Sequence, residues 1–122
     1  MKKIFLSLLF VAFSVSVNAQ NPVDRQTIKN NPNNLNEYVL EDITILSNNF
    51  DAVTEDHEQA LSELCYYKYK MLTSDITGEE LVDLTNSLKE RIRVVLGDEL
   101  YLEVSQNQPI FYRITGTTYL AQ

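Results

Sequence analysis

An all-α fold class is predicted for this chain, and three observations favour it. Apolar residues recur every three or four positions over three long segments, residues 35–50, 55–73 and 78–96. Residues that cap helices stand at the starts of these segments, and a glycine follows the last one. In the second and third segments acidic residues come early and basic residues late, which matches the helix dipole. We therefore expect one helical domain over residues 35–122, with a central antiparallel helical hairpin and a short C-terminal helix.

Residues 1–19 are expected to be a secretory signal peptide rather than part of the fold. Lys2 and Lys3 precede an apolar run from Ile4 to Val17, and Ala19 completes a small-residue cleavage pattern. The run is shorter than the roughly 20 apolar residues of a membrane-spanning helix, and no cysteine follows it to carry a lipid. The protein is therefore expected to be exported, periplasmic or extracellular, without a stable membrane anchor after cleavage.

Residues 20–34 come next and are expected to be a flexible N-terminal segment. They contain two prolines, five asparagines and little apolar material. This composition is typical of a linker or a loose chain end rather than of a helix.

Net charge argues against two classes of partner. The chain has 10 basic and 17 acidic residues, a net charge of −7 that becomes −9 once Lys2 and Lys3 are removed. An acidic domain repels the phosphates of nucleic acids and of anionic membrane surfaces. We therefore expect no nucleic-acid partner and no attachment to a membrane surface.

The first two long helices are expected over residues 35–50 and from about residue 55 to residue 73. Asn34 or Asn36 is placed to cap the first helix, and Thr54 the second. The apolar positions of the first are Leu35, Val39, Ile43, Leu46 and Phe50. Those of the second are Ala60, Leu61, Leu64, Tyr67 and Met71, widened by Cys65 and Leu72. Lys68 falls within this second apolar face, and we expect its ammonium group to reach an acidic partner such as Asp83.

The third long helix, over about residues 78–96, carries a predicted capping box of Thr77 and Glu80 and ends at Gly97. Its apolar positions are Leu81, Leu84, Leu88, Ile92 and Val95. If the turn before it is tight, Lys68 and Lys70 approach Glu79, Glu80 and Asp83 of the antiparallel partner. At the other end of the hairpin, Glu55, Asp56 and Glu58 then approach Arg91 and Arg93.

A short fourth helix is expected to start after Asp98 and to run to about Ser105. Residues 106–109 end it, and a tail rich in β-branched and aromatic residues follows. A strand there would lack a partner for its backbone groups. We expect a packed tail, or a last helical turn followed by an extended end.

No catalytic residue, cofactor or metal site is expected. The chain has one histidine, His57, and one cysteine, Cys65. They lie eight residues apart, about 12 Å along a helix, too far for one metal ion or a nucleophilic pair. The chain has no G-x-S-x-G motif, and its 3 glycines form no phosphate-binding loop. The acidic groups at the helix starts lack the spacing of a calcium loop.

The candidate interaction surface consists of Cys65, Tyr66, Tyr69 and Tyr101. Tyrosine is enriched at protein interfaces because it combines an apolar ring with a polar tip. The other interpretation is that these rings cover a small core. A lone cysteine forms no internal disulfide, so Cys65 is a buried apolar group, a reactive thiol or half of an intermolecular bridge; burial is favoured.

Two helix starts share the pattern apolar-Thr-x-x-polar, at Val53-Thr54-Glu55-Asp56-His57 and at Ile76-Thr77-Gly78-Glu79-Glu80. The pattern resembles the L-T-x-x-Q motif of Spy/CpxP-type periplasmic proteins, and the resemblance covers residues 53 to about 104. It implies a helical, often dimeric protein without catalytic residues that acts as a periplasmic chaperone or as a stress or metal sensor.

The expected function is therefore non-enzymatic. The protein would bind another protein or its own copy, or act in the envelope stress response. The alternative is a small-molecule carrier or an enzyme whose site forms only in three dimensions. An exposed apolar or tyrosine patch would favour protein binding, whereas a closed cavity with converging polar groups would favour the alternative.

Overall fold

The computed structural model describes residues 22–121, and every regular element in that range is a helix. This confirms the all-α class. The elements are α3 (Arg25–Asn30), η2 (Pro32–Asn34), α4 (Leu35–Asn49), α5 (Glu55–Leu72), α6 (Glu79–Leu96), α7 (Asp98–Ser105), α8 (Gln108–Thr115) and η3 (Thr117–Ala121). The expected signal peptide lies outside the described residues. Among residues 22–121, no helix is long and apolar enough to cross a membrane.

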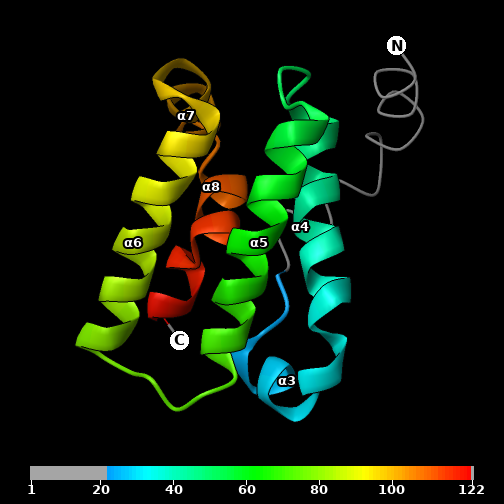
Figure 1. Ribbon diagram of the computed structural model, residues 1–122. Coiled ribbons are helices and arrows are strands. Elements are labelled where there is room, and N and C mark those ends of the chain that lie inside the picture. The colour runs from blue at the N-terminus through cyan, green and yellow to red at the C-terminus, as the bar shows by residue number, and fades with distance from the viewer. Residues whose placement is uncertain (1–21, 122) are drawn as a thin grey trace.

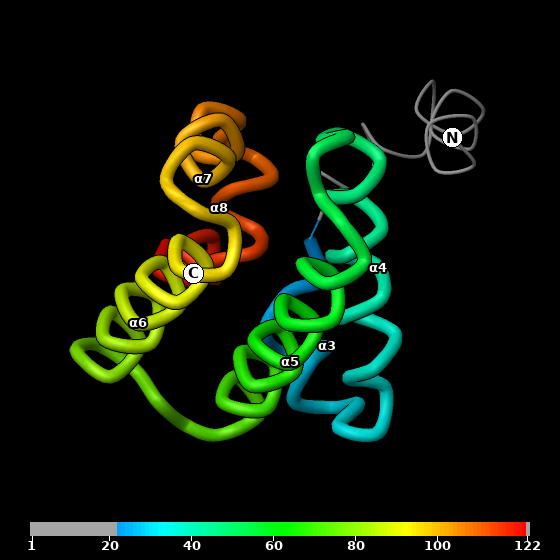
Figure 2. The backbone as a smooth tube through the Cα atoms, turned by 45° about the horizontal axis from the view of Figure 1, so that its top comes forward, coloured from blue at the N-terminus to red at the C-terminus, as the bar shows by residue number. Residues whose placement is uncertain are grey.

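Helices α4, α5 and α6 stand side by side and run alternately up and down (Figure 1). Helix α5 and helix α6 form the expected antiparallel hairpin. Helix α7 turns over the end of α6, and α8 then runs back behind the hairpin, where it packs against both α6 and α4 (Figure 2). The core lies between helices α4 to α8, and α3 closes the end of α5 near the hairpin turn.

Helix α5 begins with a capping box that satisfies two backbone groups at its N-terminus. The His57 backbone N–H donates to Thr54 Oγ1 at 3.2 Å, and the Thr54 N–H donates to His57 Nδ1 at 3.0 Å. A glutamate or glutamine usually holds the position of His57. The single histidine therefore has a structural partner at the helix start.

Helix α6 starts differently from the prediction. Its N-cap is Gly78, with φ of 55°, and no side chain caps the helix, so the capping box of Thr77 and Glu80 was wrong. The Glu80 N–H instead donates to the Thr77 carbonyl in a backbone turn at 3.1 Å. Four residues of the predicted apolar stripe, Leu81, Leu84, Leu88 and Ile92, are buried, whereas the fifth, Val95, is half-buried. Gly97, with φ of 84°, ends the helix.

The C-terminal tail is helical to a greater extent than predicted. Residues 106–109 do end α7, but Pro109 lies in the first turn of α8, where its missing N–H costs no hydrogen bond. The Asn107 side chain accepts from the Ile110 N–H at 3.4 Å and caps the new helix. Gly116, with φ of 81°, ends α8, and η3 replaces the extended end.

The expectation of flexibility over residues 20–34 was wrong for the part that the structure describes. Ile28 of α3 is completely buried, and the Asp24 carboxylate caps the helix by accepting from the Thr27 N–H at 2.8 Å. Arg25 Nη2 donates to the Ser74 carbonyl at 2.8 Å, which ties α3 to the hairpin turn. Burial of the Ile28 side chain therefore holds this segment against the domain although its neighbours are mostly polar.

Candidate functional site

Two open hollows lie between α5 and α6, and we treat them as two sections of one groove. The section near the start of α5 has a volume of about 510 Å³ and is lined by Asp56, Gln59, Ala60, Glu63, Leu64, Glu90, Arg91, Val94 and Val95. The section near the hairpin turn has a volume of about 310 Å³ and is lined by Tyr67, Met71, Glu80, Asp83, Leu84 and Ser87. We call the two sections together the α5–α6 groove.

The spacing of the lining residues shows that the two sections follow one face of each helix. On α5 they recur every three or four residues from Asp56 to Met71, and on α6 from Glu80 to Val95. That interval is one helical turn. With a rise of 1.5 Å per residue, the groove is about 22 Å long, or about four turns of helix.

The apolar floor of the groove is only partly covered. A groove stripe on α5, made of Ala60, Leu64, Tyr67 and Met71, is half-buried or exposed. Tyr67 is 43% exposed and Val94, across the groove on α6, is 70% exposed. Each section of the groove thus has one large apolar side chain that faces solvent.

The sequence predicted that mainly the groove stripe would face the core. In the structure a second stripe on α5 faces the core instead. This core stripe consists of Leu61, Cys65, Lys68 and Leu72, all of them buried. The two stripes have the same spacing of four, three and four residues and lie side by side. Only the core stripe contains a charged residue, Lys68, and it is nevertheless the stripe that is buried.

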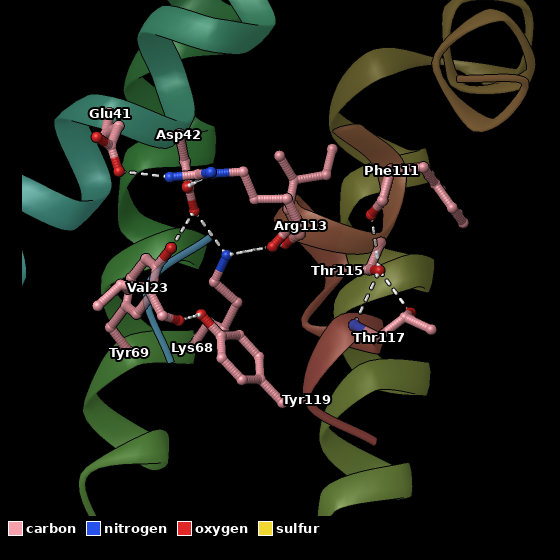
Figure 3. Close-up of polar contacts among 11 residues, drawn as sticks. Val23, Glu41, Asp42, Lys68, Tyr69, Phe111, Arg113, Thr115, Thr117 and Tyr119 are labelled. Atoms are coloured by element: carbon pink, nitrogen blue, oxygen red, sulfur yellow. Dashed lines mark hydrogen bonds and ion pairs between the residues drawn. The ribbon is translucent and has the colours of Figure 1, made fainter. Parts of the chain in front are cut away.

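The charge of Lys68 is neutralised by a buried network centred on Asp42 of α4 (Figure 3). Asp42 Oδ2 accepts from Lys68 Nζ and from the Tyr69 hydroxyl, each at 2.7 Å. Its other oxygen, Oδ1, accepts from Arg113 Nε of α8 at 2.6 Å. Asp42, Lys68, Tyr69 and Arg113 are each at most 1% exposed, so the network is closed to solvent.

The remaining polar atoms of the network also have partners. Lys68 Nζ donates to the Arg113 carbonyl at 2.7 Å, and Arg113 Nη2 donates to the half-buried carboxylate of Glu41. Two cations therefore meet two anions. Burial opposes the charged form of Arg113, but Asp42, Tyr69 and Glu41 together outweigh this effect, so the pKa of Arg113 is raised. No described buried side chain has an unsatisfied polar atom, so the network joins α4, α5 and α8 without an orphaned group.

Lys68 thus does not pair with Asp83, as the sequence analysis expected. The expected ion pairs across the hairpin are missing too: within residues 22–121, no ion pair joins Lys70 to Glu79 or Glu80. Arg93 instead pairs with its neighbours Glu90 and Asp98.

Cys65 is buried beside the network and is 3% exposed. Burial raises the pKa of its thiol to about 12; Lys68 lowers it and Asp42 raises it further. A neutral, covered thiol is a poor nucleophile. The favoured interpretation of Cys65 as a buried apolar group agrees with this environment.

The structure places the four residues of the predicted interaction surface in different environments. Tyr69 is fully buried with Cys65, and burial together with Asp42 raises the pKa of its hydroxyl. Tyr101 of α7 packs edge-on against Phe111 of α8, with ring centroids 5.6 Å apart. Tyr66 alone of the four residues is classed as exposed, at 42%. The tyrosine that lines the groove is Tyr67, which the helical wheel had assigned to the core.

No group of His, Cys, Asp and Glu side chains in the described part of the chain is arranged to hold a metal ion. In comparisons with known proteins, no family model, curated protein or solved structure matches the chain.

Proposed function

We propose that the protein is a non-enzymatic protein-binding domain, exported from the cell, whose α5–α6 groove takes a segment of its partner. The observation that supports this is the uncovered groove stripe on α5. A helix that is apolar on two adjacent faces usually buries both, and a contiguous apolar surface rimmed by polar residues is typical of a protein interaction site.

The shape of the groove favours a protein partner over a small molecule. Ligand sites typically enclose 70–90% or more of the ligand surface. The larger section of the groove has a suitable volume, about 510 Å³, but Asp56, Glu63 and Val94 on its lining are exposed. A small molecule would stay largely in contact with water there, whereas a chain segment can follow the groove over its full length.

The test uses two substitutions at equally exposed apolar positions. Val94 lies in the groove and is 70% exposed, and Leu40 lies on α4, outside the groove, and is 67% exposed. Neither substitution by aspartate disturbs the core. Capture of partners from a native extract should be lost with Val94→Asp and kept with Leu40→Asp. Equal capture by the two variants would overturn the proposal.

A chaperone role is the second candidate within the same class, and the open apolar stripe favours it. A chaperone suppresses aggregation of several unrelated clients at a low molar ratio. The suppression should depend on Val94 and not on Leu40. If no client is protected, the role is that of a domain with one defined partner.

A further inference from the structure

We infer that the occupant of the α5–α6 groove is a cationic amphipathic helix of a different protein. The inference rests on the proposed function, since it specifies the partner of the same groove. The shape of the groove fits such a helix. Two antiparallel helices with a groove of about four turns between them form the kind of surface that a third helix fills with its apolar face.

The charge of the groove lining fits the same kind of helix. The groove is lined by five carboxylates, Asp56, Glu63, Glu80, Asp83 and Glu90, and by one guanidinium, Arg91. Among residues 22–121, Asp56, Glu63, Glu80 and Asp83 form no ion pair; Glu90 pairs with Arg93. An apolar floor between rims on which four of the five carboxylates are unpaired is complementary to a helix with an apolar face flanked by lysine or arginine.

The same charges argue against a second copy of the chain in the groove. A symmetric dimer through this face would place the acidic rim of one copy against that of the other. Like charges that face each other at an interface are strongly unfavourable. With a net charge of −7, the whole chain repels its copy as well.

The probe is a synthetic 18-residue helical peptide with leucines on one face and lysines on its flanks. The control is the same peptide with glutamate in place of lysine. Fluorescence anisotropy should show that the lysine peptide binds at least about tenfold more tightly, and that added salt weakens it. Binding of the glutamate peptide with equal or higher affinity would overturn the inference.

Two double variants test whether the acidic residues that line the groove bind the lysine peptide. Glu63→Lys with Asp83→Lys reverses charge inside the groove, and Glu37→Lys with Glu99→Lys makes the same change at exposed positions outside it. The groove variant should bind the lysine peptide about tenfold more weakly than the control variant, although the net charges are equal. Equal weakening would show a nonspecific charge effect and overturn the inference.

The outcomes also separate this inference from the proposed function. If Val94→Asp abolishes capture from the extract but neither peptide binds, the groove is a binding site for another kind of segment, and the inference alone fails. If Val94→Asp abolishes self-association in sedimentation, the occupant is a second copy, and the inference fails in the same way. If Val94→Asp and Leu40→Asp capture equally, both fail.

Discussion

Lys68 shows why the buried network was missed at the level of single residues. The helical wheel correctly placed it within an apolar face, and its charge made an acidic partner necessary. The expected partner, Asp83, lies on the facing helix, whereas the observed one, Asp42, lies 26 residues earlier in the chain. A carboxylate at position 42 looks like any surface residue of a helix until the tertiary structure brings α8 and α5 to it.

The environment of Cys65 predicts an unreactive thiol. Because its pKa is raised to about 12 and its side chain is covered, the native protein should not react with a thiol reagent such as Ellman's reagent at pH 8 over minutes. One equivalent should react at once in denaturant. Fast labelling of the native protein would show that Cys65 is open to solvent.

Stability should fall at alkaline pH. The folded-state pKa values of Cys65 and Tyr69 are raised, so their contribution is complete below the unfolded-state pKa and is lost as pH rises toward the folded one. For Cys65 this window runs from about pH 9 to about pH 12. Each group changes the free energy of unfolding by at most about 1.4 kcal/mol per pH unit.

Urea unfolding at pH 8 and pH 11 measures this effect. The free energy of unfolding should decrease less between the two pH values in the double variant Cys65→Ala with Tyr69→Phe than in the unchanged protein. An equal loss in both proteins would assign the alkaline sensitivity to other groups.

At the scale of the elements, periodicity located α4, α5 and α6 to within one or two residues. It could not decide which of two adjacent stripes on α5 faces the core. The groove stripe is wholly apolar and was the obvious choice, but the core stripe is buried because Asp42 neutralises Lys68. Because the core stripe is buried, Leu64 and Tyr67 of the groove stripe stay partly exposed. The only sign of the groove in the sequence was that the apolar face of this helix is wider than the core needs.

Shorter elements were predicted less well for a related reason. Helix α3 depends on the burial of one side chain, Ile28, and α8 depends on contacts with α4 and α6. Helices of six or eight residues are marginal by themselves. Their stability comes from packing, which a local pattern does not contain.

The two helix starts give a matched test of capping. Thr54 caps α5 through its hydroxyl, whereas Thr77, before α6, caps nothing with its side chain. Thr54→Ala should lower the free energy of unfolding by about 1 kcal/mol, and Thr77→Ala by much less. Thermal or urea unfolding measures both; equal losses would contradict the assignment of the cap.

At the scale of the whole molecule, the Asp42 network holds the wall behind the groove in place by joining α4, α5 and α8. Asp42→Ala would leave the charges of Lys68 and Arg113 buried with one fewer anion. The expected cost is about 3–5 kcal/mol in the free energy of unfolding, a large part of the roughly 5–15 kcal/mol of a typical domain.

The control for this change is Glu37→Ala, which removes an exposed carboxylate from the same helix and should cost less than about 0.5 kcal/mol. Urea unfolding followed by circular dichroism measures both variants. A loss below about 1 kcal/mol for Asp42→Ala would mean that the network contributes little to the fold.

We propose that the α5–α6 groove is the face on which a partner lies. A photo-crosslinking amino acid placed at position 94, in the groove, or at position 40, outside it, tests this directly, because both positions are similarly exposed. After illumination in a native extract, position 94 should give an adduct of one defined mass, and position 40 should not. Adducts of equal yield from both positions, or from position 40 alone, would contradict the claim.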